Sequence, residues 1–182
     1  LNKTFTGGYA EGDMLRNIHN IMGSAYNDSI SGDNYNNVLE GNGGADTLKG
    51  GKGYDTLIGG SGDDVYIVNA TGAQFSEDGS GGTDTIRTSM TTFDMSTGSY
   101  TNIENLTFAG ATGARFTGTG SSIDNTITGS TSGANSLVGG AGNDCLIGGS
   151  EHDTLNGSGD ADTLVGNGGN DTIYGATAAG DT

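Results

Sequence analysis

The chain has 182 residues, of which 22 are acidic and 6 are basic, so its formal net charge is -16. So negative a chain disfavours binding to nucleic acids and to acidic membranes. Leu, Ile, Val and Phe together number only 31 of the 182 residues. This fraction lies below the roughly 20% at which a highly charged chain is expected to be disordered. One cysteine excludes a disulfide framework within the chain, and no apolar run is long enough to span a membrane.

A strand-like segment, 1–22, leads into a run of nine-residue units that begins at Gly23. Glycine opens each unit, Asp or Asn stands at the sixth position, and a large side chain stands at the eighth. Five units follow one another without a gap, and we assign 23–67 to a first repeat array. The residues at the sixth position of these units are Asp28, Asn37, Asp46, Asp55 and Asp64.

The next stretch, 68–119, is interpreted as a spacer that continues the same fold. The register runs on through 68–76, which keeps an apolar eighth residue, Phe75, but has lost the acidic turn. After a two-residue insertion, 79–87 is a further good unit with Asp84 at its sixth position. The remaining apolar residues predict short strands between Ser, Thr and Asn, and they are Phe93, Met95, Ile103, Leu106 and Phe108.

A second array fills 120–182, with one unit stretched by a residue at 129–138. The sixth-position residues of this array are Asn125, Asn135, Asp144, Asp153, Asp162 and Asp171. Eleven units in two tandem runs are far too many for coincidence, so the repeat is the organising feature of the chain.

The nine-residue period has a direct structural meaning. One apolar residue per unit, with outward neighbours on either side, predicts a three-residue strand joined to the next by a six-residue turn. Two strands then close an 18-residue coil, so that turns of like parity stack on one another. Glycine at the first, second and fourth positions lets the turn adopt positive φ and brings carbonyl groups close together.

This turn chemistry predicts calcium binding. Calcium takes about 6–8 hard oxygen ligands, and two stacked turns can supply them where one cannot. The predicted ligands are the sixth-position side chains named above, Asp84 included, together with backbone carbonyls. The glycines that would offer those carbonyls are Gly41, Gly43, Gly50, Gly51, Gly53, Gly59, Gly60, Gly62, Gly139, Gly140, Gly142, Gly148, Gly149, Gly157, Gly159, Gly166 and Gly168.

Folding and ion binding are expected to be a single event. Stacked aspartates repel one another without a counter-ion, and the 37 glycines add backbone entropy that a thin core does not offset. The metal-free chain should therefore be largely unfolded, with the binding energy of calcium serving as folding energy. If each pair of turns holds one ion, about six to eight Ca²⁺ would bind.

The two arrays, the N-I-E-N-L segment at 102–106 and the D-D-V-Y-I-V segment at 63–68 resemble the RTX β-roll regions of secreted bacterial proteins. The resemblance implies an all-β, right-handed parallel β-roll with each ion between turns n and n+2. It pairs the best ligands as Asp46 with Asp64, Asp144 with Asp162 and Asp153 with Asp171, with Asp28 and Asp46 nearly as good. Weaker pairs, which lose a charge, are Asn37 with Asp55, Asn125 with Asp144 and Asn135 with Asp153. Residues that replace the fourth-position glycine and could distort their turns are Tyr26, Tyr35 and Glu151.

The resemblance also implies export by a type I secretion system to the cell exterior or the bacterial cell surface. The chain would stay unfolded at low cytosolic calcium and fold outside, where such modules typically bind with a Kd of about 10⁻⁴–10⁻³ M. The sequence starts at Leu1 and shows no C-terminal export signal, so we expect a segment of a larger or processed protein.

No motif points to catalysis. There is no H-E-x-x-H zinc site, and the absence of proline excludes a D-P-H-D motif. We interpret His19, His152 and Cys145 as surface or turn residues, and we predict that the chain is not an enzyme.

Two functions remain open. One is a structural or adhesive module of an S-layer protein, adhesin or extracellular filament, with neighbouring copies or other modules of the same protein as partners. The alternative is a C-terminal folding and secretion domain of an extracellular hydrolase or epimerase. A recurrent Thr at the seventh position also raises ice binding, but we attribute it to β-propensity at an exposed site.

Overall fold

The computed structural model describes residues 19–77, 81–97, 100–110 and 113–175. The chain divides into two compact units, Leu1–Ile86 and Arg87–Thr182. The division falls inside the predicted spacer, just after the eighth position of the unit 79–87. Of the predicted N-terminal segment, only its last residues are described. The C-terminal end of the second array, 176–182, also lies outside the described residues.

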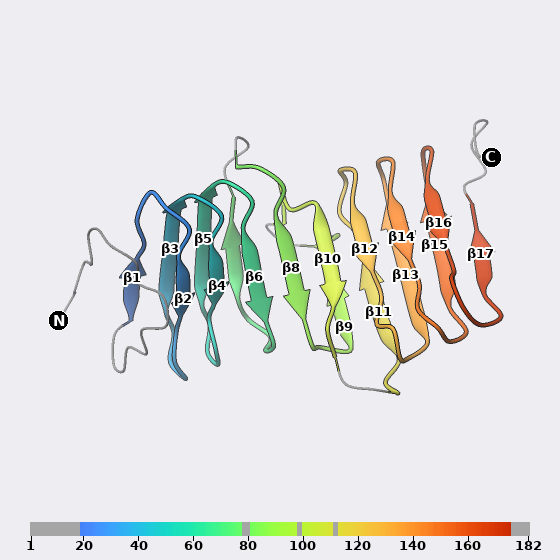
Figure 1. Cartoon of the computed structure of the whole chain (residues 1–182), viewed down its shortest axis with the longest axis horizontal. Helices are drawn as coiled ribbons and strands as arrows, with labels where there is room; N and C mark the ends of the chain where they lie inside the picture. Colours follow the sequence, from blue (N-terminus) through green and yellow to red (C-terminus); the bar gives the residue numbers. More distant parts are fainter. Residues whose placement is uncertain (1–18, 78–80, 98–99, 111–112, 176–182) are drawn as a thin grey trace. The chain divides into compact units, whose positions relative to one another are not determined.

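The first unit is a parallel β-solenoid whose successive strands alternate between two sheets (Figure 1). One sheet has the order β1-β3-β5-β7, and β2, β4 and β6 pair in the other. The strands are β1 (Asn20–Met22), β2 (Ser29–Ser31), β3 (Val38–Gly43), β4 (Thr47–Lys49), β5 (Thr56–Ser61), β6 (Val65–Val68) and β7 (Gln74–Ser76). Strand β8 (Thr85–Thr88) begins in this unit, where the Thr85 amide donates to the Asp64 carbonyl at 2.8 Å.

The register of this unit is one coil of 18 residues. Ile30 lies beside Leu48, and Leu48 beside Tyr66, while on the other sheet Leu39 lies beside Leu57. Each of these side chains is buried, whereas their neighbours at positions seven and nine are exposed or half-buried. The predicted strand position, its single buried residue and the parallel stacking are all confirmed.

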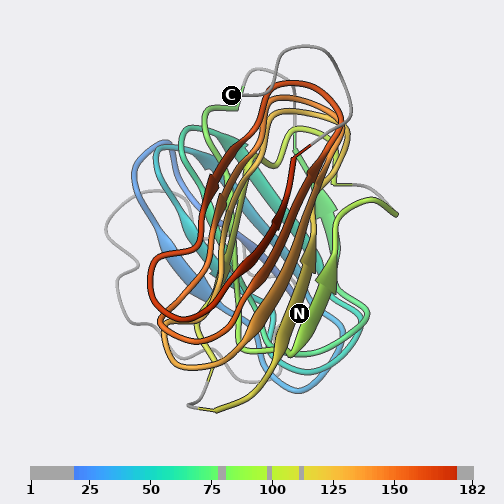
Figure 2. The same cartoon turned by 90° about the vertical axis from the view of Figure 1, so that its right-hand side faces the viewer.

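The second unit is a solenoid of the same kind. The strands β10, β12, β14 and β16 form one parallel sheet, and β9, β11, β13, β15 and β17 form the other. In Figure 2 the orange and red coils of this unit show strands on two faces and turns at both edges. Their bounds are β9 (Thr92–Asp94), β10 (Asn105–Phe108), β11 (Phe116–Thr119), β12 (Thr126–Thr128), β13 (Asn135–Gly140), β14 (Cys145–Ile147), β15 (Thr154–Ser158), β16 (Thr163–Val165) and β17 (Thr172–Tyr174).

The core of each unit consists of the stacked inward side chains of its two sheets, with aromatic rings added where the repeat degenerates. Tyr66 contacts Phe75 edge-on at a centroid distance of 5.3 Å, and Phe108 contacts Phe116 at 5.4 Å. Aromatic pairs at these separations are stabilising beyond the area that they bury. Ile173, an eighth-position residue, is 50% exposed, because no described coil packs beyond β17.

The described residues contain no helix that is both long enough and apolar enough to cross a bilayer.

Candidate calcium sites

The solenoid places the sixth-position side chains at the start of each strand, where the turn passes into the coil. Ten of the twelve are buried, and the two at the C-terminal end, Asp162 and Asp171, are half-buried. Carboxylates are rarely buried without a partner, so their surroundings are informative. The predicted ligand pairs are brought together by the fold, although their metal ligation remains a prediction.

Stacked sixth-position side chains form two ladders in each unit. We call Asp28, Asp46, Asp64 and Asp84 the first ladder. In it, the backbone N–H of each residue donates to Oδ1 of the next residue along the ladder. The Asp28 N–H donates to Asp46 at 2.7 Å, and the Asp46 N–H donates to Asp64 at 2.7 Å. The Asp64 N–H donates to Asp84 at 2.8 Å across the two-residue insertion. This bond holds Oδ1 in place and leaves Oδ2 to point into the stack.

The same contact recurs along the other edges. On the second edge of the first unit, the Asn37 N–H donates to Asp55 at 3.0 Å. In the second unit one edge holds Asn125, Asp144 and Asp162, joined at 2.8 and 2.9 Å. The opposite edge holds Asn135, Asp153 and Asp171, joined at 2.6 and 2.9 Å.

The inward oxygens of Asp28, Asp46, Asp144 and Asp153 each meet a carbonyl from the next like turn. A Cβ placed on Gly41 would collide with Oδ2 of Asp46 and lie 2.6 Å from the carbonyl oxygen of Gly59. At Gly139 the same atom would collide with Oδ2 of Asp144 and lie 2.8 Å from the Gly157 carbonyl oxygen. Carboxylate and carbonyl oxygens therefore converge over a first-position glycine that has no side chain to fill the space.

These inward oxygens fit a hard cation. Among the described residues, Oδ2 of Asp46, Asp64, Asp144 and Asp162 is buried without a hydrogen-bond partner. A buried, unpartnered carboxylate oxygen is costly, and calcium is bound by such oxygens together with backbone carbonyls. The donor set is of the kind that calcium prefers.

Burial shifts the protonation of the same groups. Burial is the main cause that raises the pKa of Asp46 from 3.8 to about 6, with the Asp64 and Asp28 carboxylates adding to it against the Asp28 N–H. Burial likewise raises the pKa of Asp144 to about 6, and the nearby Asp162 contributes. Burial also raises the pKa values of Asp55 and Asp64. Without a cation, Asp46 and Asp144 therefore favour the neutral carboxyl at mildly acidic pH.

Two asparagine positions hold a different arrangement. Nδ2 of Asn125 donates to the carbonyls of Ile103 and Glu104, both at 3.2 Å. Nδ2 of Asn135 donates to the carbonyls of Ser130 at 3.0 Å and Gly133 at 2.9 Å. The Asn125 amide thus joins two coils without metal, whereas these bonds of the Asn135 amide close its own turn.

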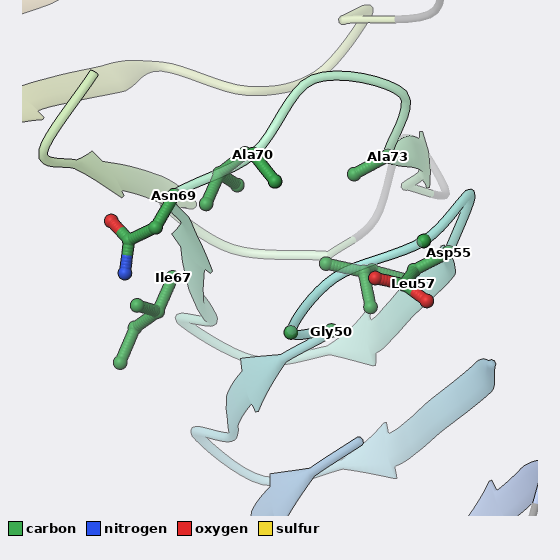
Figure 3. A pocket seen from close by; sticks show the side chains of 10 residues that line it. Gly50, Asp55, Leu57, Ile67, Asn69, Ala70 and Ala73 are labelled. Atoms are coloured by element: carbon green, nitrogen blue, oxygen red, sulfur yellow. The ribbon is translucent and has the colours of Figure 1, made fainter. Parts of the chain in front are cut away.

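The sixth position of the degenerate unit 68–76 is Ala73, so Asp55 faces no carboxylate from the next like turn. Figure 3 shows Asp55 and Leu57 on one side of a small cavity and Ala70 and Ala73 on the other. The cavity measures about 10 Å³, the space of one water molecule. This end of the second edge is therefore an incomplete site.

The three candidate reactive residues, His19, Cys145 and His152, are not members of these ladders. His152 is exposed, and its Nδ1 accepts the N–H of Asn170 at 2.8 Å, which ties two stacked turns together. His19 contacts the ring of Tyr35 edge-on at 6.1 Å, and Cys145 is a half-buried free thiol. The described contacts give these three residues structural roles at most.

A comparison with protein families identifies the repeat. The model of the RTX calcium-binding nonapeptide repeat matches four times, at 22–57, 40–70, 119–155 and 147–178. These matches cover the first predicted array, the second as far as residue 178, and more than half of the chain. The chain belongs to the RTX repeat family. RTX repeats bind calcium, and the predicted resemblance is confirmed. No curated protein matches the chain.

One carboxylate beside an RTX ladder was not predicted from the sequence. Glu77 lies with Asp64 and Asp84 so that one oxygen of each is within 4.8 Å of the others. The only sequence signal for it is the insertion at 77–78, which interrupts the nine-residue register.

Proposed function

We propose that this RTX chain is a calcium-stabilised structural or adhesive module of a bacterial cell-surface or secreted protein, such as an S-layer subunit, adhesin or filament. The supporting observation is the repeated set of buried, unpartnered aspartate oxygens beside glycine carbonyls. These stacks run through both units, so that calcium binding and the fold are inseparable.

Secretion follows from the same chemistry. A chain that folds only on binding calcium stays extended in a low-calcium cytosol and can pass a type I export channel. Outside, millimolar calcium fills the turns and makes unfolding unfavourable by mass action. RTX repeats are typical of secreted bacterial proteins, and this supports an extracellular location.

An antibody against the purified chain tests this proposal on intact cells of the source organism. Surface labelling that is lost after a chelator wash is expected for a calcium-dependent surface module. Labelling that appears only after cell lysis would contradict both export and a surface role.

The alternative is a folding and secretion domain attached to an extracellular hydrolase or epimerase. The coding sequence on either side of the present chain separates the two. A catalytic domain in the same reading frame would favour the alternative, and further repeats or adhesive modules would favour the structural role.

A further inference from the structure

The first ladder ends at an acidic group that the nine-residue repeat does not prescribe. Glu77 follows β7 directly, in the insertion that separates the units 68–76 and 79–87. Its carboxylate lies within 4.8 Å of those of Asp64 and Asp84, which are 0% and 1% exposed. Three carboxylates therefore share one buried position, where two would be expected from the repeat alone.

Glu77 occupies the position that a backbone carbonyl oxygen occupies elsewhere in the ladder. Over Gly41, the group that meets Oδ2 of Asp46 is the carbonyl oxygen of Gly59. Over Gly59, the groups that meet Oδ2 of Asp64 are Oε1 of Glu77 and the hydroxyl of Tyr66, and a Cβ there would collide with all three. The glutamate side chain thus stands where a backbone carbonyl stands one coil earlier.

Tyr66 is the second departure from the repeat. The eighth position is an aliphatic residue in the other units of the first array, and here it is a tyrosine that is 0% exposed. Its hydroxyl is buried without a hydrogen-bond partner among the described residues, as is Oδ2 of Asp64. A buried hydroxyl and a buried carboxylate that are both unpartnered, and both directed at one point, indicate a ligand at that point.

We propose that Glu77 and Tyr66, together with Asp64 and Asp84, form a calcium site of their own kind at the end of the first ladder. This inference goes beyond the repeat, whose predicted ligands are the sixth-position aspartates and turn carbonyls. The biological use of the site, but not its existence, rests on the proposed function. Three carboxylates and a hydroxyl are hard oxygen donors of the kind that calcium selects. Magnesium is disfavoured because it requires a near-ideal octahedral shell and keeps several waters.

The extra carboxylate sets this site apart in affinity. Calcium affinity rises with the number of charged ligands and with the rigidity of the site. A ladder site has two carboxylates at most, whereas this one has three and is supported by the buried ring contact between Tyr66 and Phe75. We expect it to fill first in the first unit and to fix the coil at which the regular repeat stops.

Calorimetric calcium titration of the 182-residue chain tests the site with Glu77→Gln, which removes one charge and keeps the shape. Glu40→Gln is the matched control, because Glu40 lies on β3 in the same unit and is not part of the carboxylate cluster. Loss of even an outer-shell partner commonly costs about 10–100-fold in metal affinity, so Glu77→Gln should weaken the tightest step at least about tenfold. Glu40→Gln should leave that step unchanged.

Terbium provides a second readout that does not depend on the number of calcium ions. A tyrosine whose hydroxyl contacts Tb³⁺ transfers excitation energy from its ring to the ion, so Tyr66→Phe should remove the emission that appears at the lowest Tb³⁺ additions. If Glu77→Gln fails to fold even in calcium, Tyr66→Phe decides whether the site exists, since a phenylalanine retains the ring packing.

The outcomes separate this inference from the proposed function. A wild-type chain that binds several calcium ions, with Glu77→Gln and Tyr66→Phe indistinguishable from it, overturns the inference and leaves the function intact. A wild-type chain that binds no calcium overturns both. A tightest step that is lost in Glu77→Gln and retained in Glu40→Gln supports the site.

Discussion

At the residue scale, the two side-chain oxygens of each aspartate have different tasks. Oδ1 is satisfied by a backbone N–H of the preceding coil, as at 2.9 Å between the Asp144 N–H and Asp162. Oδ2 of Asp144 is directed toward the Gly157 carbonyl and has no partner among the described residues. In Asn125 the side-chain oxygen takes the inward place, where it accepts the Ser121 N–H at 2.6 Å, and the nitrogen takes the other place and donates to carbonyls of the preceding coil. Asparagine therefore keeps an inward oxygen but brings no negative charge to the site.

This difference between the sixth-position residues predicts that single substitutions will weaken unequal numbers of calcium sites. Asp144 lies between two like turns and can serve two ions, whereas Asn37 belongs to one pair that lacks a charge. Asp144→Ala should therefore weaken two sites and Asn37→Ala only one weak site, which calorimetric titration can count. Equal losses of bound calcium in the two variants would contradict the stacked arrangement.

Protonation gives a second prediction at this scale. The folded pKa of Asp46 and that of Asp144 are about 6, above the ordinary 3.8. A raised folded pKa contributes stability below pH 3.8 that is lost as the pH rises through about 6. The metal-free chain should thus gain strand structure when the pH falls from neutrality to about 4.5, as circular dichroism in calcium-depleted buffer would show.

Calcium binding should have the opposite pH dependence. Since the ion needs ionised carboxylates, its affinity should fall as the pH drops below about 6, the pKa of Asp46 and Asp144. A metal-free spectrum and a calcium affinity that are both constant over this range would show that these carboxyls keep their ordinary pKa values when folded.

At the element scale, the glycine that opens each unit controls how closely consecutive coils approach. Gly41 lies in β3, and a Cβ there would collide with Oδ2 of Asp46 and press on the Gly59 carbonyl. Gly159 is the matched control, because the nearest atom to its Cβ would be the Gly140 carbonyl oxygen at 3.7 Å.

We therefore expect Gly41→Ala to destabilise the calcium-loaded chain by about 1–3 kcal/mol, the usual cost of overpacking. Gly159→Ala should lie within about 0.5 kcal/mol of the wild type. Thermal melts in saturating calcium provide the comparison. Similar melting temperatures for the two variants would mean that the coils can separate at Gly41 without loss.

The sequence predicts these elements well where the period is intact. The strand β2 (Ser29–Ser31) occupies positions seven to nine of its unit, as the single buried Ile30 requires. The longer β3 was not predicted, because its extension depends on contacts between coils: Asn42 pairs with Gly60 while holding a positive φ of 77°. Such pairing involves residues 18 apart and leaves no mark in a nine-residue pattern.

The candidate sites follow the same rule. The period alone predicts that Asp46 and Asp64 stack, since it fixes both the turn and its parity. It does not predict Glu77, because an insertion has no register and its side chain could point either way. It also does not predict that the Asn125 amide would bond to carbonyls of another coil, since only the charge difference from Asp is visible in the sequence.

At the scale of the whole molecule, the balance between fold and charge depends on calcium. The net charge is -16, and many of these charges are stacked in buried ladders. The opposing hydrophobic term is small, because each coil contributes few apolar side chains to a thin core. A binding free energy that exists only in the folded state must therefore supply most of the stability.

This balance predicts a calcium-driven transition of the whole chain from a disordered state to strand structure. Far-ultraviolet circular dichroism should show little strand structure in EGTA at neutral pH and a strand spectrum in millimolar CaCl₂. Equal concentrations of MgCl₂ should not substitute, because the stacked turns offer a large and irregular oxygen shell, whereas Mg²⁺ requires octahedral contacts at about 2.0–2.1 Å. High NaCl serves as the control for simple screening, which weakens repulsion between exposed charges but fills no site. A strand spectrum that is unchanged in EGTA, or is fully restored by NaCl or MgCl₂, would mean that ligation of calcium is not what holds the coils together.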